Sequence, residues 1–141
     1  MDKNDINQII NILKYPIDNK VWISKAKEIY ENTGLLSMPD FLVYNSLKLI
    51  QGESKSKFKF AYFNPQKHNV YLQPFDSNYS SKHPRNKNVI SSKGCITDDL
   101  IGLESPLRVL YNSLIFKNFI SFITNQESLY SYEDIYSSIN I

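Results

Sequence analysis

The chain has 141 residues and a formal net charge of +2, and 42% of its residues are hydrophobic, a composition that favours one folded domain spanning residues 1–141. Its sixteen basic and fourteen acidic residues are interspersed, so we expect no nucleic-acid partner. No apolar run approaches the roughly 18 residues of a membrane span, and the single cysteine and polar N-terminus are typical of a cytoplasmic protein without a membrane partner.

Two helices are predicted before residue 35. The first covers residues 5–14, with Asp2 or Asn4 as its N-cap. Its apolar residues recur at helical spacing: Ile6, Ile9, Ile10 and Leu13. The second is predicted over residues 19–32, and the glycine that follows, Gly34, is expected to cap its C-terminus.

The next part of the chain predicts strands around one further helix. Residues 35–38 are short and apolar, which indicates a buried strand. A helix is expected over residues 39–52, beginning at a proline, and a polar turn over 53–57. Phe58, Phe60 and Tyr62 alternate with other residues, as in a half-buried strand, and Val70 and Leu72 repeat that pattern.

The last part of the chain begins with a loop over residues 74–88, which is long for a compact domain and therefore either functional or mobile. Two short extended pieces, 89–91 and 95–96, are expected to pair around a glycine. A helix over 105–125 opens with a Ser-Pro pair. Residues 136–141 alternate weakly and predict a final strand.

The candidate reactive side chains form no compelling constellation by themselves. Neither His68 nor His83 is followed two residues later by a carboxylate, so we expect exposed loop histidines and no metal site. The loop also holds a basic cluster that suits either a carboxylate clamp or a solvated surface: Lys82, His83, Arg85 and Lys87. Three tyrosines near the C-terminus suit either a pocket or ordinary packing: Tyr130, Tyr132 and Tyr136.

Four sequence segments occur in an order that resembles a known family. They read TGLLSMPDFL, VYLQPFD, HPRNKNVISSKGCITDDLIGLESPLRVLYNSLIFKNFISF and LYSYEDIYSSINI. This order resembles the N-terminal half of bacterial Fe(II)/2-oxoglutarate-dependent oxygenases, in the branch that includes free amino-acid halogenases and hydroxylases. The resemblance covers nearly the whole chain, although no single segment is as specific as a metal-binding motif.

The resemblance implies an α+β fold in which N-terminal helices pack on an incomplete double-stranded β-helix (jelly-roll) sheet. It also implies an oxidoreductase, a dioxygenase that uses Fe(II) and 2-oxoglutarate to hydroxylate or halogenate an amino-acid C–H bond. In the family the S-S-I-N strand precedes the iron-binding histidine motif. Because this sequence stops inside that strand, at Ile141, we expect a truncated protein that is inactive alone.

The resemblance assigns three site residues. Asn140 matches a strand asparagine that contacts 2-oxoglutarate, Asp134 a position near the substrate amine, and Arg85 a substrate loop. The expected partners are an amino-acid-like substrate, and either a second copy or a C-terminal fragment that covers an unpaired edge at residues 136–141. The alternatives are a small non-catalytic peptide- or protein-binding module, with an aromatic pocket and an exposed strand edge, and a decayed gene product.

Overall fold

The computed structural model describes residues 6–141. Its elements in chain order are α2 (Lys20–Thr33), α3 (Tyr44–Lys57), the 3₁₀ helix η1 (Phe58–Phe60), β1 (Tyr62–His68), β2 (Val89–Cys95), the 3₁₀ helix η2 (Asp98–Leu100), α4 (Pro106–Asn112) and α5 (Leu114–Thr124). The fold is therefore α+β, as predicted, with a two-stranded antiparallel sheet. Within the described part of the chain, no helix has the length and apolar character needed to cross a bilayer.

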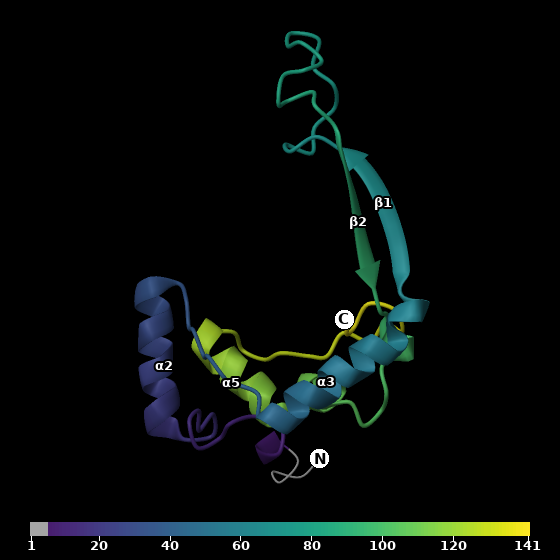
Figure 1. The fold of residues 1–141 in the computed structure, drawn as a ribbon. Helices are drawn as coiled ribbons and strands as arrows, with labels where there is room; N and C mark the ends of the chain where they lie inside the picture. Colours follow the sequence, from purple (N-terminus) through teal and green to yellow (C-terminus); the bar gives the residue numbers. More distant parts are fainter. Residues whose placement is uncertain (1–5) are drawn as a thin grey trace.

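The larger core joins the N-terminal segment, residues 6–17, to α2 and α5. Its buried residues are Ile6, Ile9, Ile10, Tyr15, Ile17, Ala26, Phe119 and Ile123. The Trp22 ring of α2 stacks on Phe119 of α5 with centroids 5.8 Å apart. Because none of these buried residues comes from β1 or β2, the helices pack mainly on one another, and the strands lie outside this core (Figure 1).

The prediction of α2 is confirmed at both ends. Asn19 caps its N-terminus, because the side-chain oxygen accepts hydrogen bonds from the backbone N–H groups of Val21 and Trp22 at 3.0 and 3.1 Å. Gly34 caps its C-terminus with a φ of 70°, a left-handed conformation that costs glycine little.

The helix predicted over residues 5–14 is wrong for most of its length. The backbone makes one helical turn, in which Ile10 N–H bonds to the Ile6 carbonyl at 2.9 Å, and then Ile10 pairs with Leu42 in an antiparallel bridge. Leu13 is 95% exposed instead of lying on a buried face. Pairing with a distant segment overrides the helical spacing, and the expected caps, Asp2 and Asn4, lie outside the described residues.

The elements expected between residues 35 and 57 are displaced. Residues 35–38 are irregular and form no strand. Asp40 has a left-handed backbone with a φ of 58°, which is incompatible with a helix beginning at residue 39. The helix α3 therefore begins at Tyr44, and it continues through residues 53–57, where a turn was expected.

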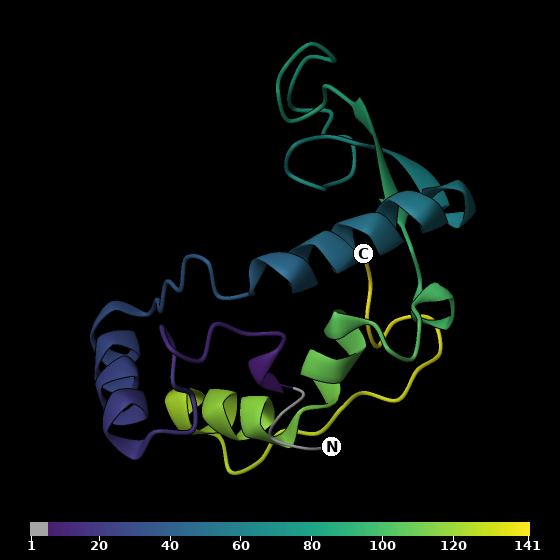
Figure 2. The ribbon, with the colours of Figure 1, turned by 60° about the horizontal axis from the view of Figure 1, so that its bottom comes forward.

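The strands β1 and β2 form a projecting hairpin, residues 62–95, that we call the arm. Its register runs from Tyr62 opposite Cys95 to His68 opposite Val89. Figures 1 and 2 both show the arm extending away from the helices. The predicted strand over 57–62 is wrong, because Phe58–Phe60 is a 3₁₀ turn.

Two further strand predictions at the arm fail. Val70 and Leu72 lie in a turn and not in a strand. Residues 89–91 and Cys95, which were expected to pair around Gly94, belong to the single strand β2, and Ile96 follows its end. The prediction of an irregular loop is confirmed, since residues 69–88 contain no helix or strand. These residues form the far end of the arm, which we call the tip loop.

The helix predicted over 105–125 is broken in two at Ser113, whose ψ of 119° ends α4. The Ser113 hydroxyl then caps α5 by accepting the Phe116 N–H at 3.3 Å. The strand predicted over 136–141 is absent. Instead, Ile141 alone pairs with Ile96, through two backbone hydrogen bonds of 2.8 and 3.1 Å. Ile96 also belongs to a smaller buried core with Ile101 and Ile139, and Ile141 packs against this core.

Candidate functional site

A polar pocket of about 260 Å³ lies between α4, η2 and the segment that follows α5. Its lining residues are Asp98, Arg108, Tyr111, Asn112, Ser131, Tyr132, Glu133, Asp134, Ile135 and Ser138. The pocket combines carboxylates, hydroxyls and two tyrosine rings, so its chemistry suits a small cationic or hydrogen-bonding ligand. It also contains Asp134, one of the three site residues that the sequence predicts.

Hydrogen bonds to α4 and α5 hold the far wall of the polar pocket in place. The Tyr132 N–H donates to the Tyr111 hydroxyl at 2.7 Å. The Ser131 hydroxyl donates to the Asn112 side chain and accepts from Lys117 Nζ, each at 3.1 Å. These contacts fix an otherwise irregular segment, and they give the pocket a defined shape.

Arg108 and Asp98 form a largely buried ion pair at the floor of the polar pocket. Arg108 Nη2 also donates to the backbone carbonyls of Asp98 and Ile101 at 2.8 and 2.9 Å, and Nε donates to Gly102 at 3.2 Å. The pair is neutral overall, and Arg108 Nε and Nη2 and Asp98 Oδ1 are already engaged. Its role is therefore to fix η2 against α4 and not to bind a ligand.

Asp134 has one saturated and one free carboxylate oxygen. Oδ1 accepts the backbone N–H groups of Tyr136 and Ser137 at 2.9 and 2.8 Å, and the Ser137 hydroxyl at 2.8 Å. These bonds, led by that from Tyr136, lower the pKa of the Asp134 carboxyl, so it stays ionised at neutral pH. Oδ2 has no partner among the described residues and is available to a cation.

Asn140 and Arg85 lie in different parts of the molecule. The Asn140 side chain is exposed, and its amide oxygen lies 3.3 Å from the sulfur of Cys95. Cys95 is the last residue of β2. Arg85 lies in the tip loop at the far end of the arm (Figure 1). Asp134 and Asn140 both belong to the C-terminal segment, but only Asp134 is among the residues that line the polar pocket, and Arg85 lies apart from both.

Within the tip loop Arg85 has partners of its own. Its Nε donates to Asp76 Oδ2 at 2.8 Å, and its guanidinium lies 5.8 Å from the centre of the Tyr79 ring. The pKa of the Asp76 carboxyl is lowered first by the backbone N–H of Asn78 and then by Arg85. In the basic cluster of residues 82–87, the Arg85 guanidinium is therefore held by Asp76 and Tyr79 and is not freely solvated.

The histidines were expected to be exposed loop residues, and for His68 this is wrong. His68 ends β1 and is half-buried, and its Nε2 lies 2.8 Å from the Ser91 hydroxyl. His83 stacks on Tyr79 with centroids 4.5 Å apart. Across residues 6–141, no three His, Cys, Asp or Glu side chains gather as metal ligands. The described residues thus do not fit an Fe(II) centre, which needs two imidazoles and a carboxylate on one side of the metal.

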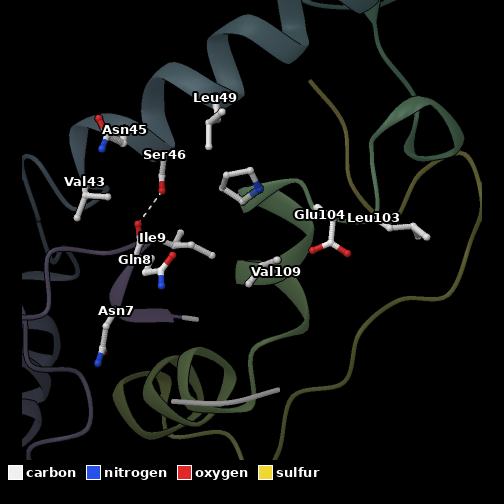
Figure 3. Close-up of a pocket in the computed structure, with 11 residues that line it drawn as sticks. Asn7, Gln8, Ile9, Val43, Asn45, Ser46, Leu49, Leu103, Glu104 and Val109 are labelled. Carbon is white, nitrogen blue, oxygen red and sulfur yellow. Dashed lines mark hydrogen bonds between the residues drawn. The ribbon is translucent and has the colours of Figure 1, made fainter. Parts of the chain in front are cut away.

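A second cavity, of about 650 Å³, lies between the N-terminal segment, α3 and α4 and was not foreseen from the sequence. We call it the groove. Its lining residues are Asn7, Gln8, Ile9, Val43, Asn45, Ser46, Leu49, Leu103, Glu104, Pro106 and Val109. Figure 3 shows Ile9, Leu49 and Val109 around one opening, with Glu104 beside it. The Ser46 hydroxyl joins two of its walls by donating to the Gln8 carbonyl at 2.8 Å.

Comparison with known proteins assigns no relative to this chain. No family model, curated protein or solved structure matches it. The chemistry of the polar pocket and of the groove is therefore argued from their own residues.

Proposed function

We propose that this chain is the N-terminal part of an Fe(II)/2-oxoglutarate-dependent oxygenase-like protein, and that its polar pocket receives the ammonium group of an amino-acid-like substrate. The observation that carries the proposal is Asp134, which lines a pocket together with Glu133 and two tyrosines and whose Oδ2 has no partner among the described residues. Opposite charge and aromatic faces together attract a cation. The order of the sequence segments supplies the reaction class.

Three further features support this proposal. The arm is a two-stranded sheet whose faces are both largely exposed, as expected of the first two strands of a sheet that needs further strands. Ile96, the residue after β2, makes two backbone hydrogen bonds with Ile141, so the chain beside the end of β2 has backbone groups that pair with another segment. Asn140 adjoins that pair, where an amide would reach 2-oxoglutarate. Arg85 reaches the substrate only if the tip loop folds toward the polar pocket.

The described residues do not assemble iron ligands, so we propose that the chain alone is inactive. The purified chain, supplied with Fe(II), 2-oxoglutarate, O₂ and an amino acid, is expected to form no succinate above a protein-free control. Measurable succinate would refute this inactivity. The oxygenase origin is tested separately by the gene, where a His-x-Asp or His-x-Gly motif is expected shortly after codon 141. A gene without that motif would contradict the proposed oxygenase origin, but it would leave the proposed binding of an ammonium group in the polar pocket untouched.

The second candidate function is a non-catalytic module that binds an extended peptide. The observation that favours it is the exposed arm, because a hairpin with an open edge can accept a peptide as an additional strand. A peptide library selected against the chain tests it. The module predicts peptides that slow hydrogen exchange along β2, and peptides that protect only the polar pocket would count against it.

A further inference from the structure

We propose that the arm, together with the end of α3 that leads into it, binds single-stranded nucleic acid. Neither Asp134 nor Asn140 belongs to this surface, so the proposal does not rest on the oxygenase assignment. The low net charge of the whole chain predicted no nucleic-acid partner, but that total combines one strongly basic part of the chain with an acidic remainder. The structure shows the basic part as one continuous projection.

Residues 55–95, which we call the basic surface, hold half of the cations of the chain. They contain eight of its sixteen basic residues and only one of its fourteen acidic residues, Asp76. The basic residues are Lys55, Lys57, Lys59, Lys67, Lys82, Arg85, Lys87 and Lys93. Asp76 pairs with Arg85, whereas the seven lysines form no ion pair with a described residue. Clustered cations without counter-charges are typical of a surface that binds a polyanion.

The cations are distributed along the whole length of the arm. Lys55 and Lys57 lie in the last turn of α3, Lys67 and Lys93 lie in the two strands, and Lys82 lies in the tip loop. Figures 1 and 2 show α3 leading into the base of the arm, with the tip loop at the opposite end. The seven residues of β1 span about 24 Å, well beyond the Debye length of about 8 Å at physiological salt. A chain-like polyanion can contact all of these charges, whereas a flat anionic membrane touched by the tip loop cannot.

Exposed aromatic rings are interleaved with these cations. The exposed rings of the basic surface belong to Phe58, Phe60, Tyr62, Phe63, Tyr71, Phe75 and Tyr79. Tyr62 lies opposite Cys95 in the sheet, so its side chain is on the same face as that of Lys93. The bases of a single strand stack on such rings while its phosphates contact the cations. The bases of a duplex are already stacked on one another, so this pattern favours a single strand.

The other face of the sheet carries a ring that is already held in position. Phe63 covers Gly94 so closely that a Cβ added to the glycine would stand 2.8 Å from a ring carbon. The Phe58 ring packs edge-on against Phe63 with centroids 5.7 Å apart, and yet Phe63 remains 49% exposed. A ring fixed in this way loses little conformational entropy when a base stacks on it. Each face of the arm thus offers a ring and a lysine.

Arg85 is held in the tip loop in a way that suits a phosphate group. Its Nε donates to Asp76 at 2.8 Å, and its two terminal nitrogens make no hydrogen bond with a described residue. The Asn86 amide nitrogen fixes the loop by donating to the carbonyls of Asp76 and Tyr79 at 2.8 and 2.9 Å. A positioned guanidinium with free terminal nitrogens can bind a phosphate through two hydrogen bonds.

Fluorescence anisotropy with labelled oligonucleotides tests the charge contribution. The full chain is expected to bind a mixed-sequence DNA strand or the RNA strand of the same sequence, and comparing the two identifies the preferred ligand. The logarithm of the affinity should fall with the logarithm of the salt concentration, by about 0.7 for each phosphate contact. Lys82→Ala combined with Lys87→Ala should make this slope shallower. Lys20→Ala combined with Lys25→Ala, which removes two exposed cations of α2, is the matched control and should leave the slope unchanged.

Tyr62→Leu tests the stacking contribution. The Tyr62 side chain makes no hydrogen bond or ring contact with a described residue, so the variant should fold like the wild type by circular dichroism. It is expected to weaken binding of the normal strand at least about fivefold. It should not weaken binding of an abasic strand of equal length, which keeps the phosphates and lacks the bases. Tyr130→Leu, at an 86% exposed position outside the basic surface, is the matched control and should bind like the wild type.

Several results would overturn the proposal. One is a wild-type chain that binds neither strand at low salt. Another is equal or tighter binding of the duplex of the same sequence, because a duplex hides its base faces. A third is binding that the lysine variant and Tyr62→Leu leave unchanged. Finally, binding to phosphatidylserine vesicles without binding to either oligonucleotide would assign the basic surface to a membrane instead.

Discussion

Arg108 gives the sharpest prediction about what holds the polar pocket together. Replacing it with Met removes the guanidinium that pairs with Asp98 and donates to the carbonyls of Ile101 and Gly102. The Asp98 residue is only 7% exposed, so its carboxylate would remain buried without a partner. Breaking a buried pair costs about 3–5 kcal/mol, and the partial exposure of Arg108 favours the lower end, about 3 kcal/mol.

Urea denaturation followed by circular dichroism measures this change in the free energy of unfolding. Lys55→Met, which removes an exposed cation from α3, is the matched control and should stay within about 0.5 kcal/mol of the wild type. Combining Arg108→Met with Asp98→Asn should cost clearly less than the sum of the two single changes, because the pair is lost once. If Arg108→Met behaves like the control, the ion pair does not stabilise the pocket.

Three further predictions concern other polar contacts. Glu53 accepts the Gly102 N–H and the Ser105 hydroxyl at 2.8 and 2.6 Å, so Glu53→Ala should lower the free energy of unfolding by about 2 kcal/mol, whereas Glu104→Ala should not change it in the same urea titration. Asn86→Ala removes the side-chain hydrogen bonds that join Asn86 to the backbone of Asp76 and Tyr79 in the tip loop. It should speed limited proteolysis of this loop while the melting temperature changes little, and an unchanged cleavage rate would show that these bonds do not hold the loop. The pKa of Asp134 is lowered in the folded chain, so its contribution to stability is present above the unfolded value of about 4 and is lost as pH falls through the folded value. Asp134→Asn should therefore lose less stability than the wild type on acidification, and equal losses in parallel melts would contradict the hydrogen-bond geometry.

Local signals in the sequence predicted features that depend on neighbouring residues. Asn19 and Gly34 mark the ends of α2 because each acts on the adjacent backbone. Asn125 ends α5 in the same local way, because it adopts a left-handed backbone conformation and its N–H donates to the Ser121 carbonyl. The irregular tip loop was predictable from its turn composition.

Features that depend on distant contacts were not predictable. Ile10 has helical spacing, yet it pairs with Leu42. Phe58 and Tyr62 alternate as in a strand, but the chain needs a 3₁₀ turn there to connect α3 to β1. Ser113 breaks a continuous apolar stripe because its hydroxyl caps a new helix. In each case a specific tertiary or capping contact outweighs the periodic pattern.

The same distinction applies to the site. Asp134 was singled out by resemblance, and the structure places it in the lining of the polar pocket. Arg108 and Glu53 gave no local signal, because each acts on residues that lie in a different element. The groove is assembled from three separate segments, so no window of the sequence contains it.

The central claim, that the polar pocket receives a substrate ammonium group, is tested most directly by a nuclear magnetic resonance titration of the isotope-labelled chain. A free amino acid should shift the backbone amide signals of Tyr132, Asp134 and Ser137 in a saturable way, and Asp134→Asn should weaken binding about tenfold. The same amino acid with its amines acetylated should give no shift. Equal shifts with the acetylated compound, or none with the free amino acid, would contradict the account.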